Sequence, residues 1–575
     1  MNKTIQRFVP ILSWLPAYKK ADLNGDIFAG ITVGIMLIPQ GMAYALIAGL
    51  PPVYGLYASI VPQIIYALLG TSRQLSVAPV AMDSLLVAAG VSVLAVEGTD
   101  TYIAFAILLA FFMGLFQFLL GIARLGFITN LLSKPVISGF TSAAALIIAF
   151  NQLKYLLGTE IPKSNRFYEV IINATEKLDQ THFITLIIGI AGIIMIKSLK
   201  QIHQNIPSAL VAVIAGTTIV YLFNLDQQGV SIVQSIPNGL PAFQMPDFSL
   251  GKFNEVLPLA FTISVVAFME AFSVAKAMEA KKRDHRVIPN QELIGLGAAN
   301  IVGSFFQAYP VTGGFSRTAV NQQAGANTPL ASIVSAGLVA LTLLFLTPLF
   351  YYLPHAILAS IIMVAVSKLF DFQYAKKLFL ESPKEFVVLT VTFLITLNIG
   401  MVIGIVSGII LSILLFLYRS AYPHIARLGR IRGHHEFRNI TRFEDLETWA
   451  ELAIIRIDAP LSFINIQEIN DYISKLIREE DHIKEIIIDA GPVSHMDATA
   501  AEGLHDILNA LNEKGVRLVI CDIIGPVRDT MKQTGLTKII GKKNLFLSLN
   551  EALENALTNA KDPYKKVTLQ SNIKT

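Results

Sequence analysis

Apolar runs close to the length of a bilayer crossing recur along the chain from Ile27 to Tyr418. A transmembrane helix needs roughly 20 predominantly apolar residues, and several of these runs are shorter than that. The mean hydropathy of the chain is +0.58, and 53% of its 575 residues are hydrophobic. This pattern predicts an α-helical membrane protein and excludes a disordered chain, a disulfide scaffold and a coiled coil.

Charged residues are distributed unevenly along the chain. Residues 1–419 hold 44 charged side chains, about 10% of that part, whereas residues 420–575 hold 42, about 27%. A soluble domain typically has about 25% charged residues. We therefore predict a transmembrane domain over residues 1–425 and a soluble domain over residues 440–560. The formal net charge of +4 is close to balance and gives no reason to expect nucleic acid as a partner.

The apolar segments number about 14. They begin near Ile27, Val53, Val77, Tyr102, Ile128, Phe183, Ile206, Val256, Glu292, Phe315, Pro329, His355, Phe386 and Gly400. Basic residues gather in cytoplasmic loops. With the N-terminus inside, the inside segments carry Lys19, Lys20, Arg73, Arg124, Lys197, Lys200, Lys281, Lys282, Arg283, Arg286, Lys376, Lys377 and Lys384.

An even number of spans places the soluble domain in the cytoplasm together with the N-terminus. The first 20 residues have no clean apolar core and no small-residue cleavage site, so we interpret them as an amphipathic lead-in rather than a signal peptide. We expect an integral, multi-pass protein of a bacterial inner membrane, surrounded by lipid.

Two of the apolar segments are interrupted by proline or glycine. Pro79 stands at the head of the third segment, and Pro310, Gly313 and Gly314 precede the tenth. If the chain consists of two halves of seven spans, both interrupted segments are the third of their half. A matched pair of this kind is typical of an inverted-repeat transporter with a binding site near the membrane midplane. The alternative is two kinked helices that serve only packing.

The interrupted segments have the chemistry of an anion site. Two half-helix N-termini offer free backbone N–H groups and about half a positive charge each. Pro79 is tolerated at such an N-terminus, and Gly313 and Gly314 allow close approach of the backbone to an ion. Arg317 adds a permanent positive charge, and Ser316 a hydroxyl donor. Alternatively, Arg317 forms a salt bridge with Asp83 or Glu270.

Ionisable side chains inside apolar spans are costly and are usually functional. Glu270, in the middle of the eighth segment, is the candidate for coupling transport to a cation, and Asp83 is a second acid near the anion site. Glu270 can load and release a proton, or ligate sodium together with backbone carbonyls. The alternative is structural pairing of Glu270 with Arg317 or Lys134, although Lys134 is better explained as an interfacial, snorkelling lysine. Gln40 either binds the substrate or serves a kink of its own helix.

The soluble part alternates strands and helices. Strands are predicted at 452–457, 485–489 and 517–522, and helices at 465–478 and 499–514, which together indicate a small α/β domain. No glycine-rich phosphate loop follows a strand, so a nucleotide-binding ATPase is disfavoured. The single cysteine, Cys521, excludes an intrachain disulfide, and we expect no metal cluster around it. Asp489, His495, Asp497 and Thr499 form no convincing catalytic set and are interpreted as caps and loop ligands.

Five stretches of the sequence resemble the SulP (sulfate permease) family of anion transporters. They are residues 26–45, residues 48–57, residues 70–79, residues 290–306 and residues 312–321. The resemblance covers about residues 23–557. It implies 14 transmembrane helices in a 7+7 inverted repeat, divided into core and gate domains, and a C-terminal cytoplasmic α/β domain similar to the STAS domain of anti-sigma-factor antagonists. The phosphorylatable Asp-Ser-Ser-Gly turn of those proteins is matched only in part by residues 497–500, Asp-Ala-Thr-Ala.

The resemblance also implies an anion site between the third and tenth spans. Together with Pro79, that site would comprise Gln40, Val80, Ala81, Phe315, Ser316 and Arg317. The family's acidic position in the eighth span, which serves proton or sodium coupling, matches Glu270. Asp83 has no such counterpart and suggests altered coupling or an altered substrate charge.

We therefore expect a secondary active transporter, and not an enzyme, for a small anion such as sulfate, bicarbonate or a carboxylate. Symport with H⁺ or Na⁺ is the predicted mechanism, no other cofactor is needed, and the protein is expected to be a homodimer. An uncoupled anion channel or an exchanger on the same fold is the alternative. A membrane-bound signalling protein is the alternative from a different functional class. The carboxylate in the eighth span favours coupled transport.

Overall fold

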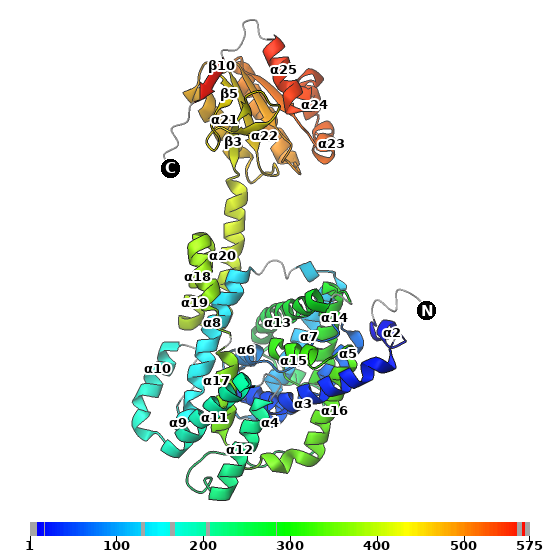
Figure 1. Cartoon of the computed structure of the whole chain (residues 1–575), viewed down its shortest axis with the longest axis vertical. Coiled ribbons are helices and arrows are strands. Elements are labelled where there is room, and N and C mark those ends of the chain that lie inside the picture. Colours follow the sequence, from blue (N-terminus) through cyan, green and yellow to red (C-terminus); the bar gives the residue numbers. More distant parts are fainter. Residues whose placement is uncertain are drawn as a thin grey trace. The chain divides into compact units, whose positions relative to one another are not determined.

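The computed structural model describes residues 9–16, 18–127, 133–161, 167–202, 207–282, 285–367, 369–559 and 566–569. These residues belong to two compact units, Met1–Ser412 and Ile413–Thr575. The first unit is helical apart from two very short strands, and the second combines strands and helices (Figure 1). The predicted fold class, a helical membrane protein with a C-terminal α/β domain, is confirmed.

Helices occupy every apolar segment that the sequence predicts as a span. Their bounds are α2 Ile11–Trp14, α3 Lys20–Ile47, α4 Pro52–Tyr57, α5 Val61–Leu69, α6 Ala81–Val91, α7 Asp100–Ile122, α8 Lys134–Asn151, α9 Leu153–Leu157, α10 Phe167–Glu176, α11 Phe183–Ile202, α12 Ser208–Phe223, α13 Phe253–Lys282, α14 Pro289–Ser304, α15 Phe315–Gln323, α16 Leu330–Leu341, α17 His355–Val366, α18 Phe372–Glu381, α19 Pro383–Asn398 and α20 Met401–Ala421. The predicted starts at Ile128 and Ile206 lie outside the described residues.

Eight of the described spans are long and apolar enough to cross a bilayer unaided, and three further apolar helices are shorter. Among the described residues, these shorter helices are α6, α12 and α17. A short helix can serve as half of a crossing when an extended segment completes it, as at an interrupted span. The total of fourteen crossings therefore depends on the short helices and stays a prediction.

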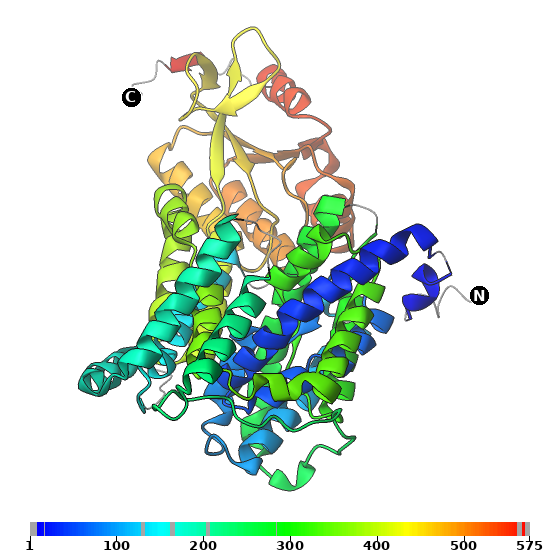
Figure 2. The ribbon, with the colours of Figure 1, turned by 60° about the horizontal axis from the view of Figure 1, so that its bottom comes forward.

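The packing of the helices repeats after seven of the predicted spans. Contacts between α3 and α16 are matched, with a shift of seven spans, by contacts between α13 and α7. In the same way, contacts between α11 and α17 are matched by contacts between α19 and α8. Likewise, α3 contacts α6 and α15, while α13 contacts α15 and α6. A shift by an odd number of spans reverses the direction of a helix in the membrane, so this packing is that of an inverted repeat. In Figure 2, the blue helix α3 lies among green helices of the second half of the chain.

Two groups of helices make up the membrane unit (Figure 1). Helices α3, α5, α7, α13, α14 and α16 pack on one another around α6 and α15, which are the two helices of the interrupted segments. Helices α8, α11, α12, α17 and α19 form the other group, through the pairs α8–α19, α11–α17 and α11–α12. The first group corresponds to the predicted core domain and holds both interrupted segments, and the second corresponds to the gate.

The second unit is built on an eight-stranded sheet. Its strands are β3 Ile425–Ile431, β4 Phe437–Asn439, β5 Leu446–Trp449, β6 Leu452–Ile457, β7 Glu485–Asp489, β8 Arg517–Cys521, β9 Leu545–Phe546 and β10 Lys566–Leu569. The order is β10-β5-β3-β6-β7-β8-β9, with β4 paired to β3. Strands β6 to β9 run parallel, and β3, β4, β5 and β10 pair antiparallel.

Helices cover both faces of this sheet. Their bounds are α21 Ile466–Glu479, α22 Ala498–Glu513, α23 Gly525–Gln533, α24 Leu536–Ile540 and α25 Leu549–Asn559. Residues of α21 to α24 share one apolar core with the sheet, and residues of α25 share the other. The predicted strands and helices of this part are all present, with bounds that differ by at most one residue. Strands β3 to β5, β9 and β10 and the last three helices were not predicted.

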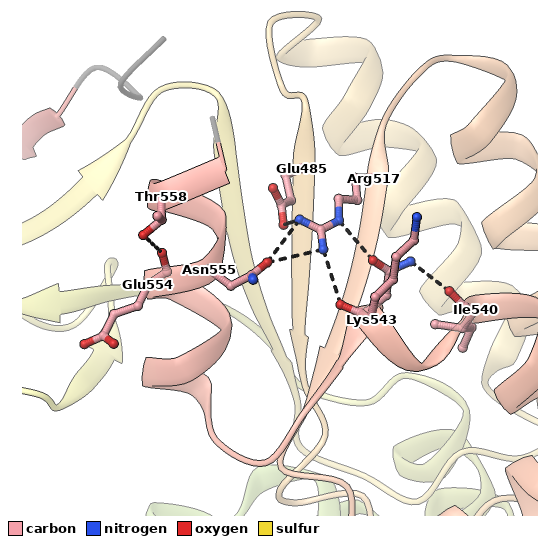
Figure 3. A network of polar contacts seen from close by, with 8 residues as sticks. Glu485, Arg517, Ile540, Lys543, Glu554, Asn555 and Thr558 are labelled. Carbon is pink, nitrogen blue, oxygen red and sulfur yellow. Dashed lines mark hydrogen bonds and ion pairs between the residues drawn. The ribbon is translucent and has the colours of Figure 1, made fainter. Parts of the chain in front are cut away.

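Arg517, at the start of β8, connects this strand to β7, to α25 and to the turn before β9 (Figure 3). Its guanidinium donates to Oε1 of the buried Glu485 on β7 at 3.3 Å and to Oδ1 of Asn555 on α25 at 3.3 and 3.4 Å. It also donates to Oδ1 of Asn544 at 3.0 Å and to the carbonyl of Lys543 at 3.4 Å. One side chain therefore joins the sheet to α25 and to the turn before β9.

We expect Arg517→Met to destabilise the second unit by about 1–3 kcal/mol, because the buried Glu485 and the half-buried Asn544 and Asn555 lose a charged donor while the stem is kept. Hydrogen exchange of residues 485–489 and 517–521 in the full-length protein measures the change. Arg478→Met, which removes an exposed arginine of α21, is the matched control. Equal protection of β7 and β8 in the two variants would contradict this role of Arg517.

Candidate functional site

The two interrupted segments meet at a short pair of strands. Strand β1 (Val77–Ala78) precedes α6, and strand β2 (Thr312–Gly313) precedes α15. They pair antiparallel, with Val77 opposite Gly313 and Ala78 opposite Thr312, and the N–H of Gly314 donates to the carbonyl of Ser76 at 3.1 Å. Because each strand leads directly into its helix and the two strands are antiparallel, α6 and α15 begin at opposite ends of this pair.

Neither helix is capped by a side chain at its N-terminus. The N-cap residues are Val80 for α6 and Gly314 for α15, both extended, and neither makes a side-chain hydrogen bond to its helix. The first N–H groups of a helix have no partner inside the helix, so an uncapped end offers them to a bound anion. Because neither N-cap is Ser, Thr, Asp or Asn, no capping side chain competes with an anion for these N–H groups.

A side chain larger than hydrogen does not fit at Gly314. A Cβ atom there would lie 2.8 Å from Nη2 of Arg317 and 3.2 Å from Cγ1 of Val80. Glycine at this position therefore lets the arginine and the first turn of α6 approach the backbone of the other segment.

Arg317 bridges the two segments. Its side chain is 2% exposed, and it donates from Nη1 to the carbonyl of Pro79 at 2.7 Å and from Nη2 to the carbonyl of Ala78 at 3.1 Å. Its Nε has no hydrogen-bond partner among the described residues. Carbonyl acceptors fix the guanidinium but leave its charge uncompensated, so Arg317 keeps a full positive charge at the meeting point of the helix ends.

Two acids accompany this charge, Glu270 through a direct interaction with Arg317 and Asp83 through an interaction with Glu270. Asp83, in the first turn of α6, is 0% exposed, and neither of its carboxylate oxygens has a hydrogen-bond partner among the described residues. Oε2 of Glu270 on α13 is likewise without a partner. Glu270 interacts electrostatically with both Asp83 and Arg317.

The alternative salt bridges do not form within the described part of the chain. No ion pair links Arg317 to Asp83 or to Glu270, although Glu270 interacts at longer range with each of the other two. Nζ of Lys134 lies 4.3 Å above the ring of Tyr374 instead of pairing with Glu270. The cluster of Arg317, Asp83 and Glu270, which we call the charge cluster, is therefore held apart rather than neutralised in pairs.

The remaining predicted site residues fall in two groups. Pro79, Val80 and Ala81 are buried at the head of α6, next to Arg317, whereas Phe315 and Ser316 are exposed at the head of α15. The buried Gln40 has an Oε1 atom without a partner and lies one turn before Tyr44, which interacts with Arg317 and Glu270. Gln40 thus projects from the side of α3 that faces the charge cluster.

Two tyrosines near the charge cluster were not predicted. Tyr44 on α3 is 7% exposed, and Tyr309, just before β2, is fully buried. The hydroxyl of Tyr309 lies 3.1 Å from that of Ser84, the residue after Asp83, and Tyr309 interacts electrostatically with Arg317 and Asp83. Tyr309 directly precedes Pro310, so its place in the interrupted segment could have identified it as a candidate site residue from the sequence.

Two polar side chains fix the second interrupted segment. Asn300 on α14 accepts from the N–H of Val311 at 2.9 Å and donates to the carbonyl of the same residue at 3.0 Å. The hydroxyl of Thr312 donates to the carbonyl of Ala267 on α13 at 2.7 Å. Ala267 lies one turn before Glu270, so the bond sets the distance between the coupling candidate and β2.

Two other buried carboxylates secure the loops at the far ends of the site. Asp26 accepts from the N–H groups of Asn327 and Thr328 at 2.7 and 2.9 Å, on the loop after α15. Glu292 accepts from the N–H and the hydroxyl of Thr71 at 2.6 and 2.5 Å, from the N–H of Ser72 at 3.1 Å, and from the hydroxyl of Tyr66 at 2.5 Å. Both were missed, because each stands at the predicted start of an apolar segment, where a carboxylate is explained by the helix dipole alone.

Removing the carboxylate of Glu292 should destabilise the loop before β1. Each buried donor left without an acceptor costs about 1–3 kcal/mol, and Glu292→Ala deprives four donors, so a loss of more than about 2 kcal/mol is expected. Thermal unfolding in detergent measures it, with Glu255→Ala, at an exposed glutamate of α13, as the control. Glu292→Gln should recover part of the loss, and equal melting of the two alanine variants would be evidence against this anchor.

One cluster in the second unit combines potential metal ligands. Atoms of Asp489, Cys521 and Asp522 lie within 4.8 Å of one another, a grouping that the sequence-based exclusion of a metal around Cys521 did not foresee. Burial raises the pKa of the Cys521 thiol and that of Asp489. Asp489 accepts from the N–H of Gly491 at 3.0 Å and Asp522 from that of Leu549 at 2.9 Å, so both acids serve as turn caps.

Asp497 is also a cap, as predicted. It accepts from the N–H of Ala500 at 2.8 Å as the N-cap of α22, and its other oxygen accepts from the N–H of Phe463 at 2.9 Å. Its carboxylate is therefore fully engaged in local structure.

Comparison with known proteins gives two domain matches. The sulfate permease family matches residues 23–392, and the STAS domain matches residues 445–552. The chain is 36% identical over 573 residues to sulfate transporter 4.1, chloroplastic, of Arabidopsis thaliana, with 96% of this chain and 83% of that protein covered. It is 31% identical to a probable sulfate transporter of Mycobacterium tuberculosis, with 93% and 96% covered.

Solved structures match the fold. The murine solute carrier 26 family member A9 anion transporter in its inward-facing state superimposes with a TM-score of 0.91 at 25% identity, covering 97% of this chain and 95% of the other. The transmembrane domain of the cyanobacterial bicarbonate transporter BicA gives a TM-score of 0.60 at 23% identity and covers 69% of this chain and 98% of the other. The second match concerns the fold alone.

Proposed function

Because the chain belongs to the sulfate permease family, we propose that it transports a small anion of the sulfate type by secondary active transport, with protons as the coupling ion. Its relatives are named as sulfate transporters, and a solved structure of similar fold is an anion transporter. The anion binds at the heads of α6 and α15, with Pro79, Val80, Ala81, Phe315, Ser316, Arg317 and Gln40 around it.

The observation that carries this proposal is the pair of uncapped helix ends beside Arg317. Two helix N-termini supply about one positive charge together, and the guanidinium supplies another. The site attracts an anion without a carboxylate bound to its arginine, and its main-chain donors reach any oxyanion. Rotation of the core group against the gate group would then expose the site to one side at a time.

Glu270 couples the anion to the cation in this scheme. When Glu270 is ionised, its charge offsets that of Arg317, and anion binding is weakened; when Glu270 is neutral, Arg317 attracts the anion fully. A proton neutralises a carboxylate through one oxygen, and Oε2 of Glu270 has no partner among the described residues. Sodium would require several oxygen ligands at one point, so the proton is favoured over sodium.

The distribution of loop charges places the STAS domain in the cytoplasm in this proposal. The transporter works as a homodimer in the bilayer of a bacterial inner membrane, and residues 1–425 and 440–560 are its two functional domains.

Uptake of labelled sulfate into proteoliposomes tests the proposal. A pH gradient, a sodium gradient and no gradient are imposed separately, with the membrane potential clamped at zero. Accumulation driven only by the pH gradient is expected. Accumulation driven by the sodium gradient would show that sodium, and not the proton, is the coupling ion. Uptake that never exceeds equilibration under either gradient would favour a channel or an exchanger.

A further inference from the structure

The charge cluster holds one more acid than the coupling scheme uses. Glu270 alone suffices to couple one proton to one anion, yet Asp83 lies beside it with both carboxylate oxygens buried and without partners in the described part of the chain. A buried carboxylate without hydrogen bonds is strongly unfavourable unless it is neutralised. A proton is the smallest ligand that satisfies such a group.

The surroundings of Asp83 leave few other ways to offset its charge. Glu270 of α13 faces it, as does the phenol of Tyr309, whereas Arg317 of α15 and Tyr44 of α3 interact with Glu270 rather than with Asp83 directly. Among the described residues of α7 and α8, which also pack on α6, no ionisable side chain interacts with Asp83. The charged side chain that interacts with Asp83 is that of Glu270, which is also an acid, so Glu270 and Asp83 disfavour each other's ionised form.

We propose that Asp83 is a second proton-binding site, and that Asp83 and Glu270 together allow the protein to carry a dianion with two protons. The inference rests on the proposed function and specifies the charge class of its substrate. The two helix ends contribute about one positive charge and Arg317 contributes one. With both acids ionised the empty site is neutral, and with both protonated it holds two positive charges, which a dianion neutralises.

Charge neutrality matters because the site moves through a low-dielectric environment during transport. An uncompensated charge there costs several kcal/mol, so states with zero net charge cross most readily. Each charge of the anion then requires one proton, and two acids permit two charges. With Glu270 as the only acid, the empty site would keep one positive charge after Glu270 ionises, so it could be neutral when loaded with a dianion but not when empty.

The stoichiometry is measured from the equilibrium accumulation of labelled sulfate in proteoliposomes at zero membrane potential. Each coupled proton contributes a factor of ten in accumulation per pH unit, so two protons give about 100-fold and one gives about tenfold for a gradient of one unit. The wild type is expected to reach about 100-fold and Asp83→Asn about tenfold. Asp83→Glu should restore 100-fold, and Asp100→Asn, at an exposed aspartate of α7, should leave it unchanged.

A binding measurement decides the question if Asp83→Asn is too slow to equilibrate. Calorimetry of sulfate binding to the full-length protein in alkaline buffers of different ionisation enthalpy counts the protons taken up on binding. Two are expected for the wild type and one for Asp83→Asn.

The outcomes separate this inference from the proposed function. A wild type that accumulates sulfate only tenfold per pH unit, or an Asp83→Asn variant that matches the wild type in both measurements, would overturn the role of Asp83 and leave proton coupling at Glu270 intact. Transport confined to monoanions such as labelled chloride would also overturn it. If no anion accumulated under a pH gradient, the proposed function itself would be contradicted.

Discussion

Arg317→Ala should reduce sulfate binding to below detection, a loss of at least about 100-fold. The substitution removes the one permanent positive charge of the charge cluster and leaves Asp83 and Glu270 without an opposing charge. A charged partner at a buried binding site contributes about 2–5 kcal/mol, and each 1.4 kcal/mol is a factor of ten in affinity. Arg317→Lys should bind sulfate more weakly than the wild type but measurably, because it keeps the charge and loses the fork that reaches both Ala78 and Pro79.

Calorimetry on the purified protein measures both variants. Arg286→Ala, at an exposed arginine of the loop before α14, is the control for a general change of surface charge. Thermal unfolding, recorded in parallel, shows whether loss of the bonds to Ala78 and Pro79 has also loosened the pairing of β1 with β2. Wild-type affinity in Arg317→Ala would remove Arg317 from the site, whatever its effect on stability.

Glu270→Gln should weaken the response of transport to a pH gradient by about tenfold per pH unit, since one coupled proton is lost. The amide is permanently neutral, so it no longer competes with the anion for the charge of Arg317. Sulfate should therefore bind Glu270→Gln more tightly than the wild type in alkaline buffer, where the wild-type carboxylate is ionised. A variant that binds better and accumulates less is the signature of lost coupling rather than of a damaged site.

Glu255→Gln provides a control on the same helix, because Glu255 is an exposed glutamate of α13. Uptake against a concentration gradient and calorimetry at two pH values are measured for both variants. If Glu270→Gln accumulated sulfate as well as the wild type did, Glu270 would be a structural residue. If Glu270→Gln were inactive and the wild type required sodium, the coupling ion would be sodium.

The interrupted segments could be located from the sequence because their signal is local. Pro79 and the pair Gly313 and Gly314 break the helical pattern at the point where the backbone becomes extended. The pairing of β1 with β2 could not be predicted in the same way, because it joins Ala78 to Thr312, which lie far apart along the chain, and two-residue strands have no periodicity to detect.

The partners of the charged residues were less predictable than their positions. From the sequence, a salt bridge of Arg317 with Asp83 or Glu270 is the alternative to anion binding, yet Arg317 binds the carbonyls of Ala78 and Pro79. That choice depends on the absence of a Cβ at Gly314, which opens the space for the guanidinium. Side-chain contacts of this kind follow from tertiary packing and leave no trace in composition.

In the second unit, strands β6, β7 and β8 could be predicted because each is a run of mostly buried aliphatic residues, such as Ile486 to Ile488. The antiparallel strands were missed for the opposite reason. Residues 425–431 mix Arg427 and Arg430 with small and apolar side chains, and this pattern is as typical of a linker as of an edge strand.

The main-chain pairing of β1 with β2 has a consequence for how such a protein diversifies. Hydrogen bonds between backbones do not depend on which side chains the strands carry, and uncapped helix ends attract negative charge whatever follows them. The attraction for an anion is therefore conserved when residues at the rim are exchanged. Single substitutions at Ala81 or Ser316 can change the size and shape of the anion that the site accepts. Such a change does not require an inactive intermediate in evolution. Natural selection can in this way adjust selectivity and retain the ability to bind anions.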